Sequence, residues 1–114
     1  MTPREFRVAL TRRAALDIEL AAEYISKDSP QNANIWYERC IDATARLRVF
    51  PRRWGLVQEP ALAKHGVRAC RVSGYRVLFV VQDNRVVVLC VRHSAMRPLT
   101  LAAFRDRLSD RTEN

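Results

Sequence analysis

The stretch from Val67 to Pro98 constrains the fold more than any other part of this 114-residue chain. It contains three runs rich in Val, Leu, Phe and Cys, which are separated by the dipeptides Ser73-Gly74 and Asp83-Asn84. Dipeptides of this kind between apolar runs are typical of tight turns that join antiparallel strands. The pattern therefore predicts two successive hairpins, which together form a three-stranded antiparallel meander.

Two-residue turns fix the register that we expect in this meander. Cys70 then lies opposite Val77, and Val77 lies opposite Cys90, so both sulfur atoms are expected on one face but two strands apart. That separation is about 9–10 Å, which is beyond the reach of a disulfide. The third cysteine is Cys40, and the spacings of the three do not match a metal site. We therefore expect three buried thiols, with no disulfide, no bound metal and no cofactor.

The first half of the chain has the pattern of a strand followed by two helices. Residues 6–11 alternate apolar and polar side chains, and Thr11 can cap the helix that follows. Ser29-Pro30 marks the start of the second helix. The apolar stripes of the two helices are Ala14, Ile18, Ala21 and Ile25, and then Ala33, Trp36, Cys40, Ala43, Leu47 and Phe50. The acids expected on the solvent side of the first helix are Asp17, Glu19 and Glu23.

These pieces predict a small α+β domain with the order β-α-α-β-β-β. The helices, which only a few residues join, are expected to form an antiparallel hairpin on one face of a curved, mainly antiparallel sheet. A long loop at residues 51–66 precedes the meander, and loops of this length often carry function. We expect one domain over residues 1–98. After it, residues 99–114 are expected to form a short helix that Thr100 caps and then a frayed tail.

The positive charge is concentrated in one part of the chain. Residues 51–97 hold nine basic and two acidic groups, or +7 of the net charge of +8, whereas residues 1–50 are nearly balanced. This asymmetry predicts an anionic or acidic partner. The sequence has no apolar run of membrane-spanning length, and its first residues lack the pattern of a signal peptide. We therefore expect a cytoplasmic protein that does not bind membranes.

The residues at the joins between these elements carry a resemblance to a known family. They are Ala14-Ala15-Leu16-Asp17-Ile18, Tyr24-Ile25 before Ser29-Pro30, Ala33, Trp36, Leu47, Phe50-Pro51, Gly66-Val67-Arg68, Tyr75-Arg76-Val77 and Val91-Arg92-His93. In this order, over about residues 5–98, the chain resembles the RelE/ParE superfamily of bacterial toxins from type II toxin–antitoxin systems. The resemblance implies the superfamily's fold, a cognate antitoxin protein, and contact with operator DNA only through the toxin–antitoxin complex.

The two branches of this superfamily differ in chemistry. The RelE-like branch cleaves messenger RNA on the ribosome, whereas ParE-like members are associated with poisoning DNA gyrase. RNA cleavage needs a base, a cationic clamp for the phosphate and an acid. The candidates here are Arg71, Arg76 and His93, since the expected register places Arg71 opposite Arg76 and His93 diagonally beside Arg76. RNA-cleaving relatives typically have a tyrosine just after the last strand, but residues 94–98 contain none.

The missing tyrosine favours the ParE-like branch, in which no residue of this chain is catalytic. The basic residues of the meander are then candidates for binding the target or another anion, because like charges opposite each other in a sheet are destabilising unless an anion joins them. These candidates are Arg68, Arg71, Arg76, Arg92 and Arg97. The same side chains can instead extend into solvent or pair with an acidic antitoxin segment. No aromatic platform alternates with them, so recognition of single strands by stacking is not expected.

Three functions therefore compete. The first is a ParE-like toxin that inhibits an essential enzyme, with DNA gyrase as the expected target, and that has no chemistry of its own. The second is a RelE-like endoribonuclease that uses Arg71, Arg76 and His93. The third is an inactive toxin that serves only as antitoxin partner and co-repressor.

Overall fold

The computed structural model describes residues 2–113. Its strands and helices, in chain order, are β1 (Arg7–Thr11), α1 (Arg12–Ser26), α2 (Pro30–Arg46), η1 (Pro51–Arg53), α3 (Pro60–Ala63), β2 (Arg68–Val72), β3 (Tyr75–Gln82), β4 (Arg85–His93), α4 (Leu101–Leu108) and β5 (Thr112–Glu113). None of these helices is both long enough and apolar enough to cross a bilayer.

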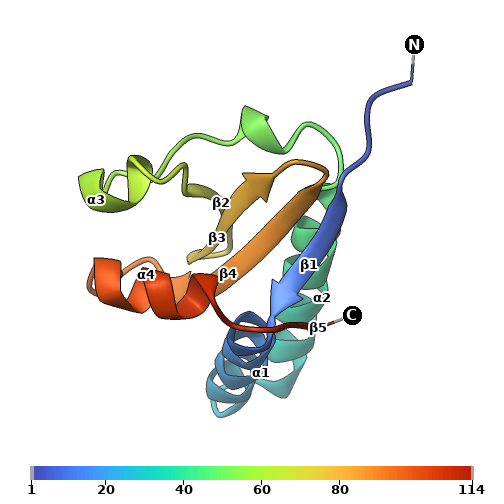
Figure 1. Ribbon diagram of the computed structural model, residues 1–114. Helices are drawn as coiled ribbons and strands as arrows, with labels where there is room; N and C mark the ends of the chain where they lie inside the picture. The colour runs from blue at the N-terminus through green and yellow to red at the C-terminus, as the bar shows by residue number, and fades with distance from the viewer. Residues whose placement is uncertain (1, 114) are drawn as a thin grey trace.

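The strands form one mixed sheet in the order β2-β3-β4-β1-β5. β2, β3 and β4 are the predicted antiparallel meander, and β1 joins it by parallel pairing with β4. The expected α+β architecture, with a helical hairpin on a mainly antiparallel sheet, is confirmed (Figure 1). The tail that we expected to fray instead forms β5, in which Thr112 and Glu113 pair with the end of β1.

The helix caps and the hairpin turn form at the residues that the sequence predicted. The Thr11 hydroxyl accepts a hydrogen bond from the amide N–H of Ala14, and the Ser29 hydroxyl accepts one from Asn32, so each helix begins at a side-chain cap. Ser73 and Gly74 both have positive φ, at 42° and 85°, as a tight hairpin turn with the twist of the strands requires.

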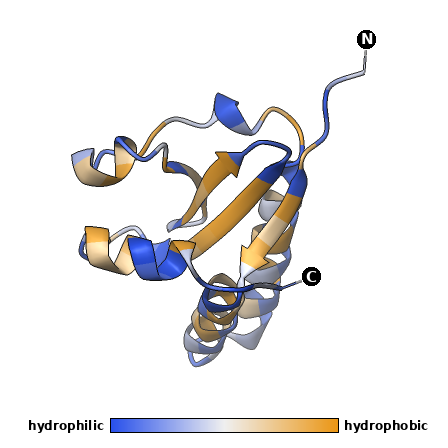
Figure 2. Cartoon of the chain, viewed as in Figure 1, coloured by the Kyte–Doolittle hydropathy of each residue, from blue (hydrophilic) through white to orange (hydrophobic). Residues whose placement is uncertain are grey.

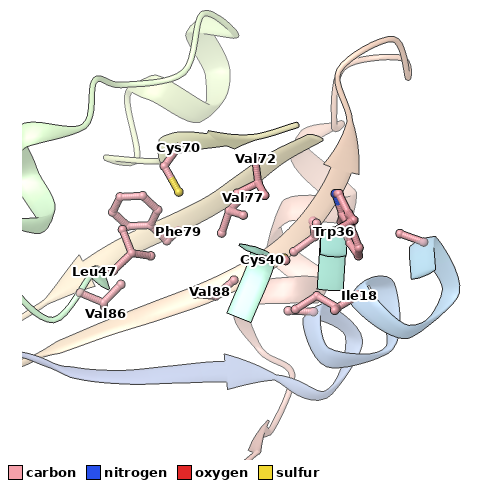
Figure 3. Close-up of a cluster of buried hydrophobic side chains, with 13 residues drawn as sticks. Ile18, Trp36, Cys40, Leu47, Cys70, Val72, Val77, Phe79, Val86 and Val88 are labelled. Carbon is pink, nitrogen blue, oxygen red and sulfur yellow. The ribbon is translucent and has the colours of Figure 1, made fainter. Parts of the chain in front are cut away.

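The helical hairpin covers one face of the sheet with the predicted apolar stripes. Ile18, Trp36, Cys40 and Leu47 are buried there against side chains from β2, β3 and β4 (Figure 3). Phe50 departs from the prediction. It lies beyond the end of α2 with a left-handed φ of 49°, and its side chain is 60% exposed because the chain turns away from the sheet at this residue.

The opposite face of the sheet carries a second core that we had not predicted. It packs Leu62 of α3 and Phe104 of α4 against Leu78, Val80 and other side chains of the strands. β3 and β4 are apolar along most of their length (Figure 2), and a strand that is apolar on both faces must be covered on both. The long loop and the C-terminal helix therefore close the second face.

A β-bulge in β4 changes the predicted register. Leu78 pairs with Cys90 and Phe79 with Val88, which leaves Leu89 as the extra residue. Val77 consequently lies opposite Val91, so the expected pairing of Val77 with Cys90 is wrong. Cys70 and Cys90 belong to cores on opposite faces of the sheet. Both are free thiols, and burial raises the pKa of Cys70 to about 11 and that of Cys90 to about 12.

Polar groups from three elements satisfy the backbone at this bulge. The carbonyl oxygen of Leu89 accepts hydrogen bonds from the Thr11 hydroxyl, at 3.3 Å, and from the guanidinium of Arg107, at 3.2 Å. Asp17 accepts the N–H of Val91 at 3.0 Å and forms an ion pair with Arg107 at 2.8 Å. Asp17 was expected on the solvent side of α1. It is instead mostly buried, because its helix packs against the bulged strand and its carboxylate pairs with Arg107 of α4.

Removing the charge of Asp17 is expected to destabilise the fold. We predict that Asp17→Asn lowers the free energy of unfolding by about 2 kcal/mol, because it leaves Arg107 unpaired beside the bulge. Urea unfolding measures the change. Asp106→Asn makes the same substitution at an exposed position of α4 and should cost less than about 0.5 kcal/mol. Equal costs for the two variants would contradict the role that we assign to Asp17.

Truncating Phe104 tests the second core. Phe104 is the fully buried residue by which α4 packs on the sheet. Phe104→Ala should therefore lower the free energy of unfolding by about 3–5 kcal/mol. Phe50→Ala is the matched control, since its ring is exposed, and we expect a change within about 0.5 kcal/mol. If Phe104→Ala unfolds at the same urea concentration as Phe50→Ala, α4 does not pack as described.

Candidate functional site

Three arginines lie side by side across β2, β3 and β4. Arg71 pairs in register with Arg76, and Arg76 pairs with Arg92. Their side chains lie on the face opposite the helical hairpin, because each alternates with residues of the hairpin core, such as Val72, Val77 and Val91. We call Arg71, Arg76 and Arg92 the arginine row. The bulge at Leu89 creates it, since without the extra residue Arg92 would point to the other face.

The central arginine of the row is bound by an acid from the long loop. The two carboxylate oxygens of Glu59 accept hydrogen bonds from the two terminal nitrogens of Arg76, at 3.1 and 3.0 Å. The side chains of Glu59 and Arg76 are 15% and 16% exposed, so the pair is largely shielded from water. The hydrogen bond from Arg76 lowers the pKa of Glu59, and the same bond raises the pKa of Arg76.

The other two members of the row are less completely paired. Arg92 donates one hydrogen bond, to the carbonyl oxygen of Arg97 at 2.7 Å, and its buried Nε has no hydrogen-bond partner within residues 2–113. Arg71 is exposed and lines a hollow of about 460 Å³ together with Glu59, Arg76 and Met96. The row thus holds three guanidinium groups, and one carboxylate, that of Glu59, pairs with the central one. The other two positive charges have no acid partner in the row.

Arg68 and Arg97 lie outside the row. Arg68 points to the other face of β2, where its guanidinium donates to the carbonyl oxygens of Trp54, at 2.7 Å, and Arg52, at 3.2 Å. It therefore ties the long loop to the sheet. Arg97 is exposed just beyond β4 and contributes its backbone carbonyl to Arg92. Of the five candidate anion-binding arginines, the structure brings together three.

His93 lies on the helical-hairpin side of the sheet. It pairs with Tyr75 across the strands, with ring centroids 5.0 Å apart, and Tyr75 in turn contacts Trp36 at 4.8 Å. The expected position of His93, diagonally beside Arg76 on one face, is wrong because the bulge shifts the register by one residue. The Nδ1 of His93 accepts a hydrogen bond from the amide N–H of Ala95.

A second basic surface, which the sequence had not indicated, adjoins the row. Arg39 and Arg46 of α2, Arg53 of η1 and Arg71 of β2 line a groove of about 540 Å³ at the edge of the sheet, together with Asp42, which pairs with Arg46 at 3.0 Å. α2 belongs to the half of the chain that is nearly balanced in charge, so its arginines gave no signal. Because Arg71 also lines the hollow beside the row, the positive surface continues from the row around β2.

The geometry of the row is suited to binding an anion rather than to moving a proton. Arg71 and Arg76 present guanidinium forks that match carboxylate or phosphate. Glu59 is a poor proton acceptor, since its pKa is lowered, and His93 lies across the sheet. Within residues 2–113 no group of three or more His, Cys, Asp or Glu side chains is placed to hold a metal ion.

The Glu59–Arg76 pair should make the free energy of unfolding depend on pH in the acid range. In the folded chain the pKa of Glu59 is lowered from its ordinary value of 4.5. The contribution of the ion pair to the free energy of unfolding is therefore complete above pH 4.5, and it is lost as the pH falls through the lowered pKa of the folded state. We predict that Glu59→Gln costs about 1–2 kcal/mol near pH 7. The difference from the unmodified chain should shrink as the pH falls to about 3. Urea unfolding across this range measures it.

Glu38→Gln is the control for this titration, because Glu38 is exposed on α2. Its difference from the unmodified chain should stay near zero at every pH. A cost for Glu59→Gln that is the same at both ends of the range would show that the carboxylate does not carry the effect.

Comparisons with known proteins agree with the geometry of the fold. The structure of a chromosomal ParDE toxin–antitoxin system from P. aeruginosa superposes with a TM-score of 0.64 at 18% identity, over 79% of this chain and 97% of that chain. The toxin–antitoxin complex RelBE2 from Mycobacterium tuberculosis gives a TM-score of 0.53 at 28% identity, over 84% of this chain and 97% of that chain. No curated protein matches the sequence.

A family model, described as ParE toxin of type II toxin-antitoxin system, parDE, matches residues 8–98. The match runs from β1 to the end of the meander and so includes the helical hairpin, the long loop and the arginine row. Because it covers well over half of the sequence, this chain belongs to the ParE toxin family of type II toxin–antitoxin systems.

Proposed function

We propose that this ParE-family toxin arrests growth by poisoning DNA gyrase and that a cognate antitoxin neutralises it. The observation that carries the proposal is the separation of the candidate nuclease groups. His93 lies on the helical-hairpin face, whereas Arg71 and Arg76 lie on the opposite face. A toxin without a convergent acid–base site acts most simply by binding its target.

The groups near the row support inhibition by binding rather than cleavage of RNA. Removing the proton of a 2′-hydroxyl needs a base whose pKa lies near the working pH. The carboxylate closest to Arg76 is Glu59, and its pKa is lowered by the bond to Arg76. Residues 94–98, which follow β4, contain no tyrosine that could supply an acid.

An antitoxin partner is consistent with the exposed apolar side chains of the helical hairpin. Leu16, Leu20 and Tyr24 follow one another at spacings of four on α1, and all three are exposed. Such a stripe on a helix is an apolar surface that a partner can cover. Both of the solved structures compared above are toxin–antitoxin assemblies. In this proposal the toxin acts in the cytoplasm and reaches operator DNA only within the complex.

A RelE-like endoribonuclease is the second candidate function. The 28% identity to the RelBE2 complex favours it, as does a row of arginines that can bind a phosphate. In that case Arg71 and Arg76 would hold the RNA, and His93 would have to act from outside the row.

Controlled expression of the chain without an antitoxin separates these functions. We expect double-strand DNA breaks with intact transcripts, and we expect His93→Ala to arrest growth as the unmodified chain does. The same vector without the coding sequence serves as the control for growth arrest. Transcript cleavage that disappears in Arg71→Ala and Arg76→Ala, with intact DNA, would establish the endoribonuclease instead. No arrest from the folded chain would point to an inactive toxin that acts only as partner and co-repressor.

A further inference from the structure

The arginine row is an incompletely filled anion site. Arg71, Arg76 and Arg92 stand in register on adjacent strands, where like charges directly opposite each other are destabilising. One carboxylate, that of Glu59, binds the central arginine. The Nε of Arg92 is buried without a partner within residues 2–113, although a buried charged donor normally has one. The row can therefore accept more negative charge than Glu59 supplies.

The contact between Glu59 and Arg76 shows which functional group the row can bind. Its two oxygens face the two terminal nitrogens of Arg76 in the paired arrangement of a carboxylate and a guanidinium. This acid belongs to the long loop rather than to the sheet, and it immediately precedes α3, a helix of only four residues. The buried Leu62 and the hydrogen bonds from Arg68 anchor this loop, and none of these contacts involves the Glu59 side chain.

The surroundings of the row favour an extended acidic chain as the external ligand. Arg71 is exposed and lines both the hollow beside Glu59 and the groove of Arg39 and Arg53, in which Arg46 is already paired with Asp42. A chain that runs from that groove past Arg71 reaches the hollow that Arg76 also lines. Bases of a nucleic acid would find little to stack on, because the ring of Trp54, the aromatic residue of this groove, is already covered by the guanidinium of Arg53 at 5.3 Å.

We propose that the arginine row is a carboxylate-binding site for an acidic, extended segment of a partner protein, and that Glu59 occupies the site until this segment displaces it. The loop acid acts as an internal competitor. Arg76 is then free in only a fraction of the molecules. The apparent affinity for the external carboxylate equals the intrinsic affinity multiplied by that fraction. Glu59 also keeps Arg76 paired when no partner is present. The inference does not depend on DNA gyrase being the target.

The test measures binding of a fluorescent poly-glutamate peptide to the full chain at fixed ionic strength. Glu59→Gln removes the competitor and should bind the peptide roughly tenfold more tightly than the unmodified chain. Glu38→Gln makes the same change of net charge on α2 and should alter the affinity by less than about twofold. Adding Arg76→Gln to the Glu59→Gln variant should abolish the gain. Equal affinities for Glu59→Gln and Glu38→Gln, or a gain that survives Arg76→Gln, would overturn the proposal.

Two further measurements keep the test decisive. Arg71→Gln changes an exposed side chain without touching the ion pair, and it should weaken peptide binding severalfold even if Glu59→Gln proves too unstable to assay. Unchanged peptide binding by Arg71→Gln would count against the site. A labelled single-stranded oligonucleotide with the same net charge as the peptide tests whether the row prefers phosphate to carboxylate. If Glu59→Gln improves oligonucleotide binding but not peptide binding, the row recognises phosphate, and the carboxylate assignment is wrong.

Discussion

The β-bulge at Leu89 is the feature on which the rest of the structure depends. One extra residue in β4 reverses the faces of the residues beyond it, so that Arg92 joins Arg71 and Arg76 while His93 turns toward the helical hairpin. The freed backbone groups are satisfied from β1, α1 and α4, which brings the two ends of the sequence to the same strand. The bulge therefore decides both what the row contains and where the C-terminal helix packs.

Half of the six arginines between Val67 and Pro98 are engaged by the fold itself. Arg68 and Arg92 donate to backbone carbonyls, and Arg76 is paired with Glu59, so only part of the charge counted in the sequence is available to a partner. The available part lies at Arg71, Arg85 and Arg97, which are exposed, and from Arg71 the basic surface continues into arginines of α2 and η1, outside the meander. A strongly basic sequence segment thus differs from the basic surface that the folded chain presents.

Much of the fold follows from local signals in the sequence. The turn at Ser73-Gly74 and the caps at Thr11 and Ser29 each act through one short-range interaction, and residues 8–98 match the family that the order of elements suggested. The bulge could not be predicted, because Leu89 lies within a run of apolar residues, and either face can bury it. The Glu59–Arg76 contact was missed for another reason, since it depends on the path of a loop. The second core did leave a signal, in strands that are apolar on both faces.

The parallel pairing of β1 with β4 has a consequence for the order in which the molecule can form. Arg7 pairs with Arg85, so the first strand to be synthesised has no partner in the sheet until the ribosome has made the last strand of the meander. Contacts so distant in sequence form late and slowly. During translation the helical hairpin exists without the sheet that buries its apolar stripe, and the arginine row does not yet exist. A nascent chain therefore cannot complete the arginine row until β4, which carries Arg92, has been made.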